Sequence, residues 1–212
     1  MENVKVALWG FGAMGSGIAK VLLRKKGVDI VGVCDIHPAR VGRSIYELLE
    51  IDRGSRDDVL VNPKIEEVVH NGNCDICVIA TDSFTRKAFN KIKFVVEQNV
   101  NVVSTAEEMS FPMAQEPELS AEMDKLAKEH GVSILGTGIN PGLMMDLLAI
   151  CLSGCMTDVE KVTCRRVNSL SPFGPAVMEE QGVGLSVNDF NTGVENGTLA
   201  GHVGFAESVG MI

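Results

Sequence analysis

One stretch near the start of the chain restricts the fold more than any other part of the sequence. The apolar run at residues 4–9 is followed directly by Gly10-Phe11-Gly12-Ala13-Met14-Gly15, which has the spacing G-x-G-x-x-G. Apolar residues then recur at helical spacing, at Met14, Ile18, Val21 and Leu22. The glycines therefore lie where a predicted strand passes into a predicted helix, and in this context the motif is typical of a dinucleotide-binding loop.

The residues of this loop suit a bound pyrophosphate. Gly10 allows the tight turn, Gly12 lets the backbone come close to the phosphates, and Gly15 lets the helix pack near the strand. The phosphates would accept hydrogen bonds from free N–H groups at the positive end of the helix dipole. We therefore predict a cofactor-binding loop made of Gly10, Phe11, Gly12, Ala13, Met14 and Gly15.

An acid at the end of the next predicted strand supports this interpretation. The apolar run at residues 30–34 ends at Asp35, 20 residues after Gly15, and an acid at this spacing accepts hydrogen bonds from the adenosine ribose. The alternative is a solvated carboxylate at a strand end. Ile36 and Arg40 belong to the same predicted site; Arg40 could contact a 2′-phosphate, but Asp35 would repel that phosphate. The sequence predicts NAD as the cofactor, with NADP as the alternative.

Predicted strands and helices alternate about six times before residue 138. This alternation predicts an α/β fold with a doubly wound parallel (Rossmann) sheet. Ligands of such sheets bind outside the carboxyl ends of the strands, near the point where the strand order reverses. We expect the ribose and nicotinamide beside residues that follow two strands, namely Ala80, Thr81, Asp82, Ser83, Thr105 and Ala106. Asp82 could also be a helix N-cap.

The pattern changes at residues 136–142, where glycine and proline are typical of a domain junction. We predict a dinucleotide-binding domain at residues 1–139 and the beginning of an α+β substrate and dimerisation domain at residues 140–212. In the second domain the sequence predicts a helix at 143–152, a strand of a second sheet at 159–167 and a helix at 202–212. Because these strands are too few for an independent sheet, we expect a fragment of a longer protein.

Charge and composition argue against several classes of protein. The formal net charge is −9 and the longest basic block is Arg24-Lys25-Lys26, which disfavours nucleic acid or a membrane surface as the partner. No apolar run reaches the roughly 18–20 residues that span a bilayer, and the first residues lack the apolar segment of a signal peptide. We therefore expect a cytoplasmic protein that binds a small molecule.

The six cysteines favour a reduced protein without a metal site. Cys74 and Cys77 have C-x-x-C spacing, which would permit a redox or zinc site. The pair lies inside an apolar predicted strand, without a second such pair or a nearby group of histidines, so we interpret it as buried core. Cys151, Cys155 and Cys164 are interpreted in the same way, as small buried residues of a cytoplasmic protein.

Four motifs together resemble one family. They are Trp-Gly-Phe-Gly-Ala-Met-Gly at residues 9–15, Ser-Thr-Ala-Glu-Glu-Met at 104–109, Gly-Thr-Gly-Ile-Asn-Pro-Gly at 136–142 and Gly-His-Val-Gly-Phe-Ala-Glu-Ser at 201–208. The chain resembles the 2,4-diaminopentanoate dehydrogenases, which belong with the native amine dehydrogenases to the dihydrodipicolinate-reductase-like group. The resemblance implies NAD(P)-dependent oxidative deamination of 2,4-diaminopentanoate to 2-amino-4-oxopentanoate and ammonia, in the degradation of amino acids such as ornithine.

Two adjacent acids are the predicted catalytic residues. Hydride leaves a carbon that bears a neutral amine, and the resulting iminium needs an activated water; a carboxylate beside the nicotinamide can serve both steps. Glu107 and Glu108 follow a predicted strand that ends near the expected nicotinamide, and the resemblance places the key glutamate in this segment. We favour Glu107 and keep Glu108 as the alternate. Either acid could instead stabilise a helix start through the helix dipole.

The predicted substrate contacts come from the second half of the chain. The resemblance places Asn140 and Pro141 at the nicotinamide and substrate, with a plain turn as the alternative. Arg165 and Arg166 are candidates to bind a substrate carboxylate; only one of them can point inward from a strand, and two solvated arginines are the alternative. His202 is a candidate polar group of the active site, with a structural histidine as the alternative. The resemblance also implies a homodimer.

Other functions remain open on the sequence. The chain could be another dehydrogenase of this fold, of the dihydrodipicolinate reductase, homoserine dehydrogenase or saccharopine dehydrogenase type. The dihydrodipicolinate reductases carry two adjacent histidines, which this sequence lacks. It could also be a regulatory domain that binds NAD(H) without catalysis. Because a sensor needs no carboxylate beside the nicotinamide, the segment at residues 105–108 discriminates between the enzyme and the sensor.

Overall fold

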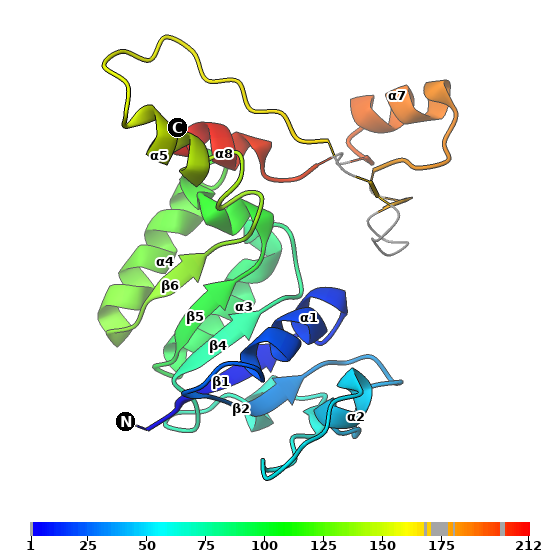
Figure 1. The fold of residues 1–212 in the computed structure, drawn as a ribbon, viewed down its shortest axis with the longest axis vertical. Helices are drawn as coiled ribbons and strands as arrows, with labels where there is room; N and C mark the ends of the chain where they lie inside the picture. The colour runs from blue at the N-terminus through cyan, green and yellow to red at the C-terminus, as the bar shows by residue number, and fades with distance from the viewer. Residues whose placement is uncertain (1, 168, 171–177, 180, 200–201) are drawn as a thin grey trace.

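The structure is a computed structural model that describes residues 2–167, 169–170, 178–179, 181–199 and 202–212. A sheet with helices on both faces forms the first part, and helices and extended segments near one end of that sheet form the second (Figure 1). The elements of the first part are β1 (Val4–Trp9), α1 (Ala13–Leu22), β2 (Val28–Cys34), α2 (Ile45–Leu49), β3 (Val61–Asn62), η1 (Ile65–Glu67), β4 (Ile76–Ile79), α3 (Thr85–Glu97), β5 (Asn101–Ser104), η2 (Glu107–Ser110), η3 (Pro112–Ala114), α4 (Pro117–His130) and β6 (Ile134–Gly136). They are followed by α5 (Leu147–Ser153), α7 (Val187–Glu195) and α8 (Phe205–Met211).

The sheet has six strands in the order β3-β2-β1-β4-β5-β6, and all the pairings between these strands are parallel. The chain first builds outward from β1 to β3 and then returns to place β4 on the other side of β1. The strand order therefore reverses between β1 and β4, and their carboxyl ends form the crevice in which ligands of such sheets bind. The predicted doubly wound parallel sheet is confirmed.

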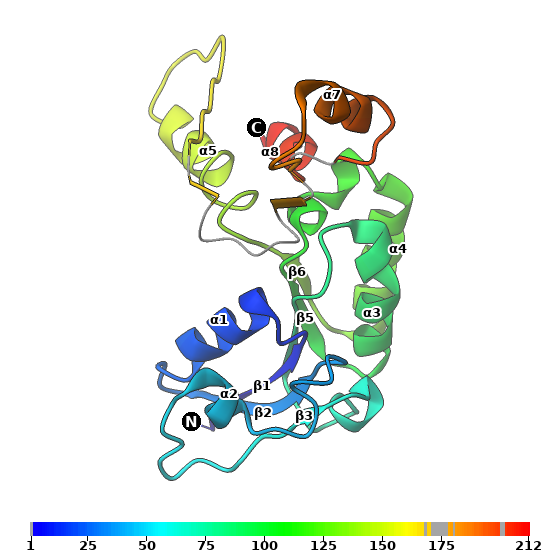
Figure 2. The ribbon, with the colours of Figure 1, turned by 90° about the vertical axis from the view of Figure 1, so that its right-hand side faces the viewer.

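The two faces of the sheet bury two separate cores. Side chains alternate along a strand, so Leu8 of β1 faces α1 and α2 while Ala7 faces α3 and α4. Figure 2 shows these two helix pairs on opposite sides of the sheet. The most deeply buried side chains of the first core include Leu8, Val33 and Ile45, and those of the second include Ile79, Ile92 and Val96. Burial on both faces explains the nearly continuous apolar strands.

The predicted packing face of α1 is wrong at two of its four residues, whereas Ile18 and Leu22 pack against the core as predicted. Met14 and Val21 are 63% and 55% exposed, and the helix instead buries Gly15 and Ala19. The reason is the close approach of this helix to the turn before it: a Cβ on Gly15 would lie 1.9 Å from the carbonyl oxygen of Gly10. Small residues therefore face the sheet, and Met14 points toward the crevice.

The next helix is shorter than the pattern from residue 38 to residue 49 predicts. Residues 38–43 form turns, and α2 begins only after Ser44, whose side chain accepts a hydrogen bond from the N–H of Tyr46 at 3.2 Å. A serine at this position satisfies a free N–H of the first turn, so it fixes the start of the helix.

The second part of the chain departs further from expectation. No strand forms at residues 159–167, which are extended and mostly exposed, because no described segment lies beside them to complete a ladder. The helices predicted from residues 143 and 202 begin later, at Leu147 and Phe205, and α7 was not predicted. Cys151 and Cys155 are exposed rather than buried. Within the residues described, no helix is long and apolar enough to cross a membrane.

Candidate active site

The glycine loop lies against the end of β4. Gly10 has φ +99°, which favours glycine, and a Cβ on it would lie 2.6 Å from the carbonyl oxygen of Ala80. The N–H of Gly10 donates to the carbonyl oxygen of Cys34 at the end of β2. The turn between β1 and α1 therefore sits at the crevice where the strand order reverses.

The start of α1 fits a phosphate group. Gly12 caps this ten-residue helix without a side-chain hydrogen bond, and the space where its Cβ would lie is open, with no atom within 4 Å. Ala13 and Met14 are exposed in the first turn. First-turn N–H groups have no partner within the helix, so this end offers both donors and room for an anion.

Asp35 ties the glycine loop to β2. Its carboxylate accepts hydrogen bonds from the N–H groups of Phe11 at 2.6 Å and His37 at 2.8 Å, and it lies 3.3 Å from the guanidinium of Arg40. Burial acts to raise the pKa of this carboxyl, but the hydrogen bonds and Arg40 outweigh burial and hold the pKa below its usual value. The neighbouring Ile36 is 83% exposed.

A cavity of about 310 Å³ opens beside the glycine loop, at the carboxyl ends of β4 and β5. Seven of the predicted residues line it together: Met14, Ala80, Thr81, Asp82, Ser83, Thr105 and Glu107. The side chains of Phe11 and Ala106 are buried, so these two predicted residues offer a ligand only their backbone. Phe84 and Lys87 also line the cavity and were not predicted; their position one helical turn after β4 could have indicated them.

Asp82 is held by a lysine and does not cap α3. Lys91 Nζ lies 2.5 Å from Asp82 Oδ2 and 2.9 Å from Thr81 Oγ1. The N-cap position of α3 belongs to Phe84, which makes no side-chain capping hydrogen bond. The charge of the Asp82 carboxylate is therefore balanced by Lys91 within the wall of the cavity, and Lys91 holds the side chains of Asp82 and Thr81 in place.

The structure separates the two adjacent glutamates. Glu108 is buried, and its Oε2 accepts a hydrogen bond from the N–H of Thr85 at 2.7 Å, so it completes the first turn of α3. Burial raises the pKa of the Glu108 carboxyl, and the carboxylates of Glu207 and Glu116 raise it further, against the opposing hydrogen bond from Thr85. Glu107 lines the cavity instead. Only Glu107 thus has the position that chemistry on a ligand requires.

Asn140 and His202 come together although they are far apart in the sequence. Asn140 Nδ2 lies 3.5 Å from His202 Nε2, and the histidine ring lies 4.8 Å from the ring of Phe205, centre to centre. Burial lowers the pKa of the His202 imidazole and Arg166 lowers it further, against backbone hydrogen bonds that act to raise it. Asn140 Oδ1 and His202 Nδ1 are buried and have no hydrogen-bond partner among the described residues.

The segment after His202 lies close to Pro141 and to Glu107. A Cβ on Gly204 would lie 2.5 Å from Pro141 Cδ and 3.3 Å from Glu107 Cβ. The bond between Asn140 and Pro141 is cis. Gly204 thus lies against both Pro141 and Glu107, whereas the predicted residues Asn140, Pro141 and His202 are not among those that line the cavity.

Asp146 is a buried acid that was not predicted. It is 0% exposed, and it accepts hydrogen bonds from Gly142, Leu147 and Ser208. Burial acts to raise its pKa, but these hydrogen bonds together hold the pKa below its usual value. An acid inside the otherwise apolar run at residues 143–152 was the sequence signal that could have indicated it.

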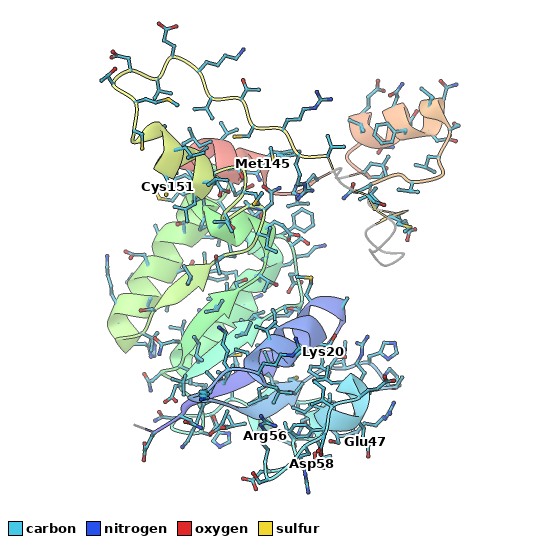
Figure 3. The ribbon with its side chains drawn as sticks, in the orientation of Figure 1. Lys20, Glu47, Arg56, Asp58, Met145 and Cys151 are labelled. Atoms are coloured by element: carbon cyan, nitrogen blue, oxygen red, sulfur yellow. The ribbon has the colours of Figure 1, made fainter. Side chains whose placement is uncertain are left out.

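Arg165 and Arg166 lie elsewhere. They line a second groove of about 410 Å³ between α5 and the extended segment at residues 159–166. Met145, labelled in Figure 3 near α5, lines the same groove, as do Leu148 and Leu152. The predicted inward-facing arginine of a strand is not present, because the strand does not form, and neither arginine lines the cavity with Glu107.

The described residues offer no metal or redox centre. No group of three or more potential ligands among them could hold a metal ion. Cys34, Cys74 and Cys77 are buried and free. Burial, with a smaller effect of Asp75, raises the pKa of the Cys74 thiol to about 11, and burial likewise raises that of Cys77. Thiolates are the reactive form, so the C-x-x-C pair belongs to the core, as predicted.

Comparison with known proteins agrees with this geometry. Residues 4–137, more than half of the chain, match the sequence model of the oxidoreductase family with an NAD-binding Rossmann fold. The chain belongs to this oxidoreductase family. The family description names NAD, which confirms the predicted class of cofactor. Residues 143–212 match the model of the 2,4-diaminopentanoate dehydrogenase C-terminal domain.

Two relatives resemble nearly the whole chain. A curated 2,4-diaminopentanoate dehydrogenase from Acetoanaerobium sticklandii is 60% identical over 100% of this chain, which covers 60% of that protein. The solved amine dehydrogenase from Mycobacterium smegmatis is 33% identical with a TM-score of 0.75, over 92% of this chain and 56% of that one. The present chain thus spans between half and two thirds of the length of these two relatives.

A more distant structure shares only the fold. An oxidoreductase from Bacteroides fragilis is 16% identical with a TM-score of 0.50, over 65% of this chain and 38% of that one. At this identity the likeness supports the Rossmann architecture of the family and nothing about substrate.

Proposed function

We propose that this oxidoreductase catalyses the NAD-dependent oxidative deamination of a small diamino acid, 2,4-diaminopentanoate. The amine, NAD⁺ and water would give 2-amino-4-oxopentanoate, ammonia, NADH and a proton. One observation carries the proposal: Glu107 lines the cavity at the end of β5 together with residues from the glycine loop and the end of β4. The names of the 60% identical relative and of the solved amine dehydrogenase support the choice of an amine substrate.

The residues that would hold the cofactor form one continuous path. The pyrophosphate would lie over Gly12 at the start of α1, where the structure has donors and open space. The ribose hydroxyls would meet Asp35, and the exposed side chain of Ile36 would cover the adenine. Ala80, Thr81, Ser83 and Thr105 would surround the nicotinamide, which supplies the acceptor for hydride. Arg40 beside Asp35 would allow NADP as a weaker alternative.

Glu107 would handle the protons of the reaction. Its carboxylate would bind the substrate ammonium and take one proton from it, which leaves the neutral amine from which hydride can depart. The substrate then carries a C=N⁺ group. After it has passed this proton to solvent, Glu107 would take a proton from the water that attacks this carbon and return it to the nitrogen, so that ammonia leaves as the C=O group forms and the hydroxyl proton is released. Glu108 cannot share this task without giving up its hydrogen bond to Thr85 at the start of α3.

The walls of the cavity offer contacts for the other polar groups of a diamino acid. Lys87 lines the same cavity as Glu107, and its ammonium suits the substrate carboxylate. Asn140 Oδ1 and His202 Nδ1 are buried polar atoms without partners among the described residues, and the second amino group of the substrate would give them one. Arg166, which acts on the pKa of His202, is the alternative site for the carboxylate; Arg165 lies beside it in the second groove.

The proposal is tested by turnover with matched substrates. We expect the purified natural full-length protein to form equal amounts of NADH and ammonia from 2,4-diaminopentanoate. The hydroxy analogue 2-amino-4-hydroxypentanoate should give neither. NADH without ammonia from the hydroxy compound would indicate another dehydrogenase class, such as the homoserine type. Tight NAD(H) binding without turnover of either compound would indicate a sensor. Either result contradicts the proposal.

We also infer a cytoplasmic homodimer. All six cysteines are free thiols, which suits a reducing compartment. The exposed apolar side chains of α5, Leu147, Leu148 and Leu152, offer a self-complementary surface. Cell fractionation and light scattering of the natural protein test these two points, and a monomer at micromolar concentration would contradict the second.

A further inference from the structure

A completely buried carboxylate connects three segments around the candidate active site. Asp146 Oδ2 accepts hydrogen bonds from the N–H of Gly142 at 2.8 Å and from Ser208 Oγ at 2.8 Å. Its Oδ1 accepts from the N–H of Leu147 at 2.6 Å. The three donors belong to the loop after β6, to the start of α5 and to α8. Asp146 is 0% exposed, so water cannot replace any of these donors.

The loop held by Asp146 is the one that carries Asn140 and Pro141. This loop is tightly folded, because a Cβ on Gly142 would lie 2.6 Å from the nitrogen of Gly138. A hydrogen bond that fixes the N–H of Gly142 therefore fixes the end of a turn with little freedom of its own. The position of the Asn140 side chain follows from the position of that turn.

The helix held by Asp146 is also fastened to the segment of Glu107. Glu207 on α8 is 0% exposed, and its Oε1 accepts a hydrogen bond from Gln115 Nε2 at 2.8 Å. Gly210 packs on the ring of Phe111, since a Cβ on Gly210 would lie 2.9 Å from carbon atoms of that ring. Figure 1 shows α8 at the end of the molecule above β6, and α8 contacts η2 and η3 there. One face of α8 thus meets η2 and η3, and another meets Asp146.

We infer that Asp146 is a positioning residue that sets Asn140 and His202 in register with Glu107, through Gly142 on one side and Ser208 on the other. The inference rests on the proposed function. Asp146 does not touch the cavity, so it acts on the reaction only through the loop and α8. A displacement of about 1 Å between reacting groups can cost about 100-fold in rate, and this sensitivity makes such a connector consequential.

Only a carboxylate meets all three donors. An asparagine at this position keeps one acceptor oxygen, and its NH₂ group would face donors where Asp146 presents its second oxygen. In Asp146→Asn at least one of the bonds to Gly142, Leu147 and Ser208 must break, while the volume of the side chain hardly changes. The substitution therefore tests the hydrogen bonds rather than the packing.

The experiment is an epistasis test in the natural full-length protein. We expect Asp146→Asn to lower kcat for 2,4-diaminopentanoate by about 10- to 100-fold and to leave the Kd for NAD⁺, from fluorescence titration, within about twofold. Asn140→Ala should lower kcat as well. The double variant should lose less than the product of the two single losses, because part of the effect of Asp146 passes through Asn140 and the rest through Ser208. Asp158→Asn, at an exposed acid, is the matched control and should behave like the wild type.

Each outcome decides the inference. Multiplied losses in the double variant, or a Kd for NAD⁺ that rises together with the loss of kcat, would show a general structural role and overturn it. Unchanged kcat in Asp146→Asn would also overturn it. If that variant does not fold, Ser208→Ala removes only one donor and should still lower kcat by about fivefold. Absence of amine-dependent NADH formation in the wild type would instead refute the proposed function.

Discussion

The two parts of the molecule bury their apolar side chains to different degrees. In the Rossmann part, Leu8, Val33, Ile45 and Ile92 are fully covered by the sheet and its helices. In the second part, Leu152 of α5 is 59% exposed, as are many apolar residues near it. Among the residues described, the fully buried polar side chains of the second part are two acids, Asp146 and Glu207. Asp146 accepts a hydrogen bond from Ser208, and Glu207 accepts one from Gln115.

This difference teaches how the candidate site divides its tasks. The Rossmann part is stabilised by its own two cores, so it can hold Glu107 and the cavity wall rigidly. The second part contributes Asn140, Pro141 and His202, and specific hydrogen bonds rather than a core determine where they lie. Chemistry is thus expected to depend on the first part, and alignment on the second.

The strongest test of this division is Glu107→Gln. The amide has nearly the same shape but cannot accept a proton, so we expect kcat for amine oxidation to fall by about 100- to 10,000-fold. The Kd for NAD⁺ should stay unchanged, because the glycine loop is not altered. Glu108→Gln is the matched control and should keep most of the activity. Equal losses in both variants would refute the assignment of chemistry to Glu107 alone.

A pair of leucines compares the two parts in stability. Leu8→Ala should lower the free energy of unfolding by about 2–5 kcal/mol, because it leaves a cavity between β1 and α1. Leu152→Ala should change it by less than about 0.5 kcal/mol, because the side chain is largely exposed. Urea titrations of both variants measure the contrast. A large loss in Leu152→Ala would show that α5 is covered in solution, as in the inferred homodimer.

The variant Lys87→Met tests whether the Rossmann part also recognises the carboxylate of the substrate. We expect kcat/KM for 2,4-diaminopentanoate to fall by about 10- to 100-fold, the effect of losing a hydrogen bond between charged groups. The diamine without the carboxylate, 1,3-diaminobutane, should react equally well with variant and wild type. Arg166→Met is the matched comparison from the second part. If that variant alone lost discrimination, the substrate carboxylate would lie at Arg166, outside the set of residues that line the cavity with Glu107.

The smallest expected effect is the dependence of stability on acid. The folded state holds the pKa of Asp35 below the ordinary value of 3.8, so this residue stabilises the fold at pH values above 3.8. That stabilisation is lost as the pH falls through the lower pKa of the folded state. We therefore expect Asp35→Asn to be less stable than the wild type at neutral pH and the difference to shrink in acid. A difference independent of pH in urea titrations would contradict this origin.

Much of the Rossmann part could be predicted from the sequence, because its structure follows from local patterns. Alternating strands and helices predicted the parallel sheet, and the spacing from the glycines predicted an acid at the end of the second strand, although its hydrogen bond from the N–H of Phe11 was not predicted. The packing face of α1 could be predicted only in part, because it depends on the close approach of Gly15 to Gly10, where an added Cβ would lie 1.9 Å from the Gly10 carbonyl oxygen. Periodicity alone selects the larger residues, Met14 and Val21.

For the site, the sequence predicted the catalytic segment but could not decide between its two adjacent glutamates. Sequence placed Glu107 and Glu108 together, and the bond from Thr85 to Glu108, across 23 residues, separates their tasks. Asp146 acts through Ser208, 62 residues away, and no local pattern reports such a contact. The missing strand at residues 159–167 has a similar cause, since alternation signals a strand only where a neighbouring strand is available.

The distribution of thiols allows the rate at which the sheet opens to be measured by cysteine labelling. Cys34, Cys74 and Cys77 lie in or beside β2 and β4 and are shielded from solvent, whereas Cys151 and Cys155 are open to it. An alkylating reagent would modify the latter two immediately and reach the former three only when the strands separate. Mass spectrometry of a labelling time course would therefore follow the unfolding of one half of the chain without interference from the other.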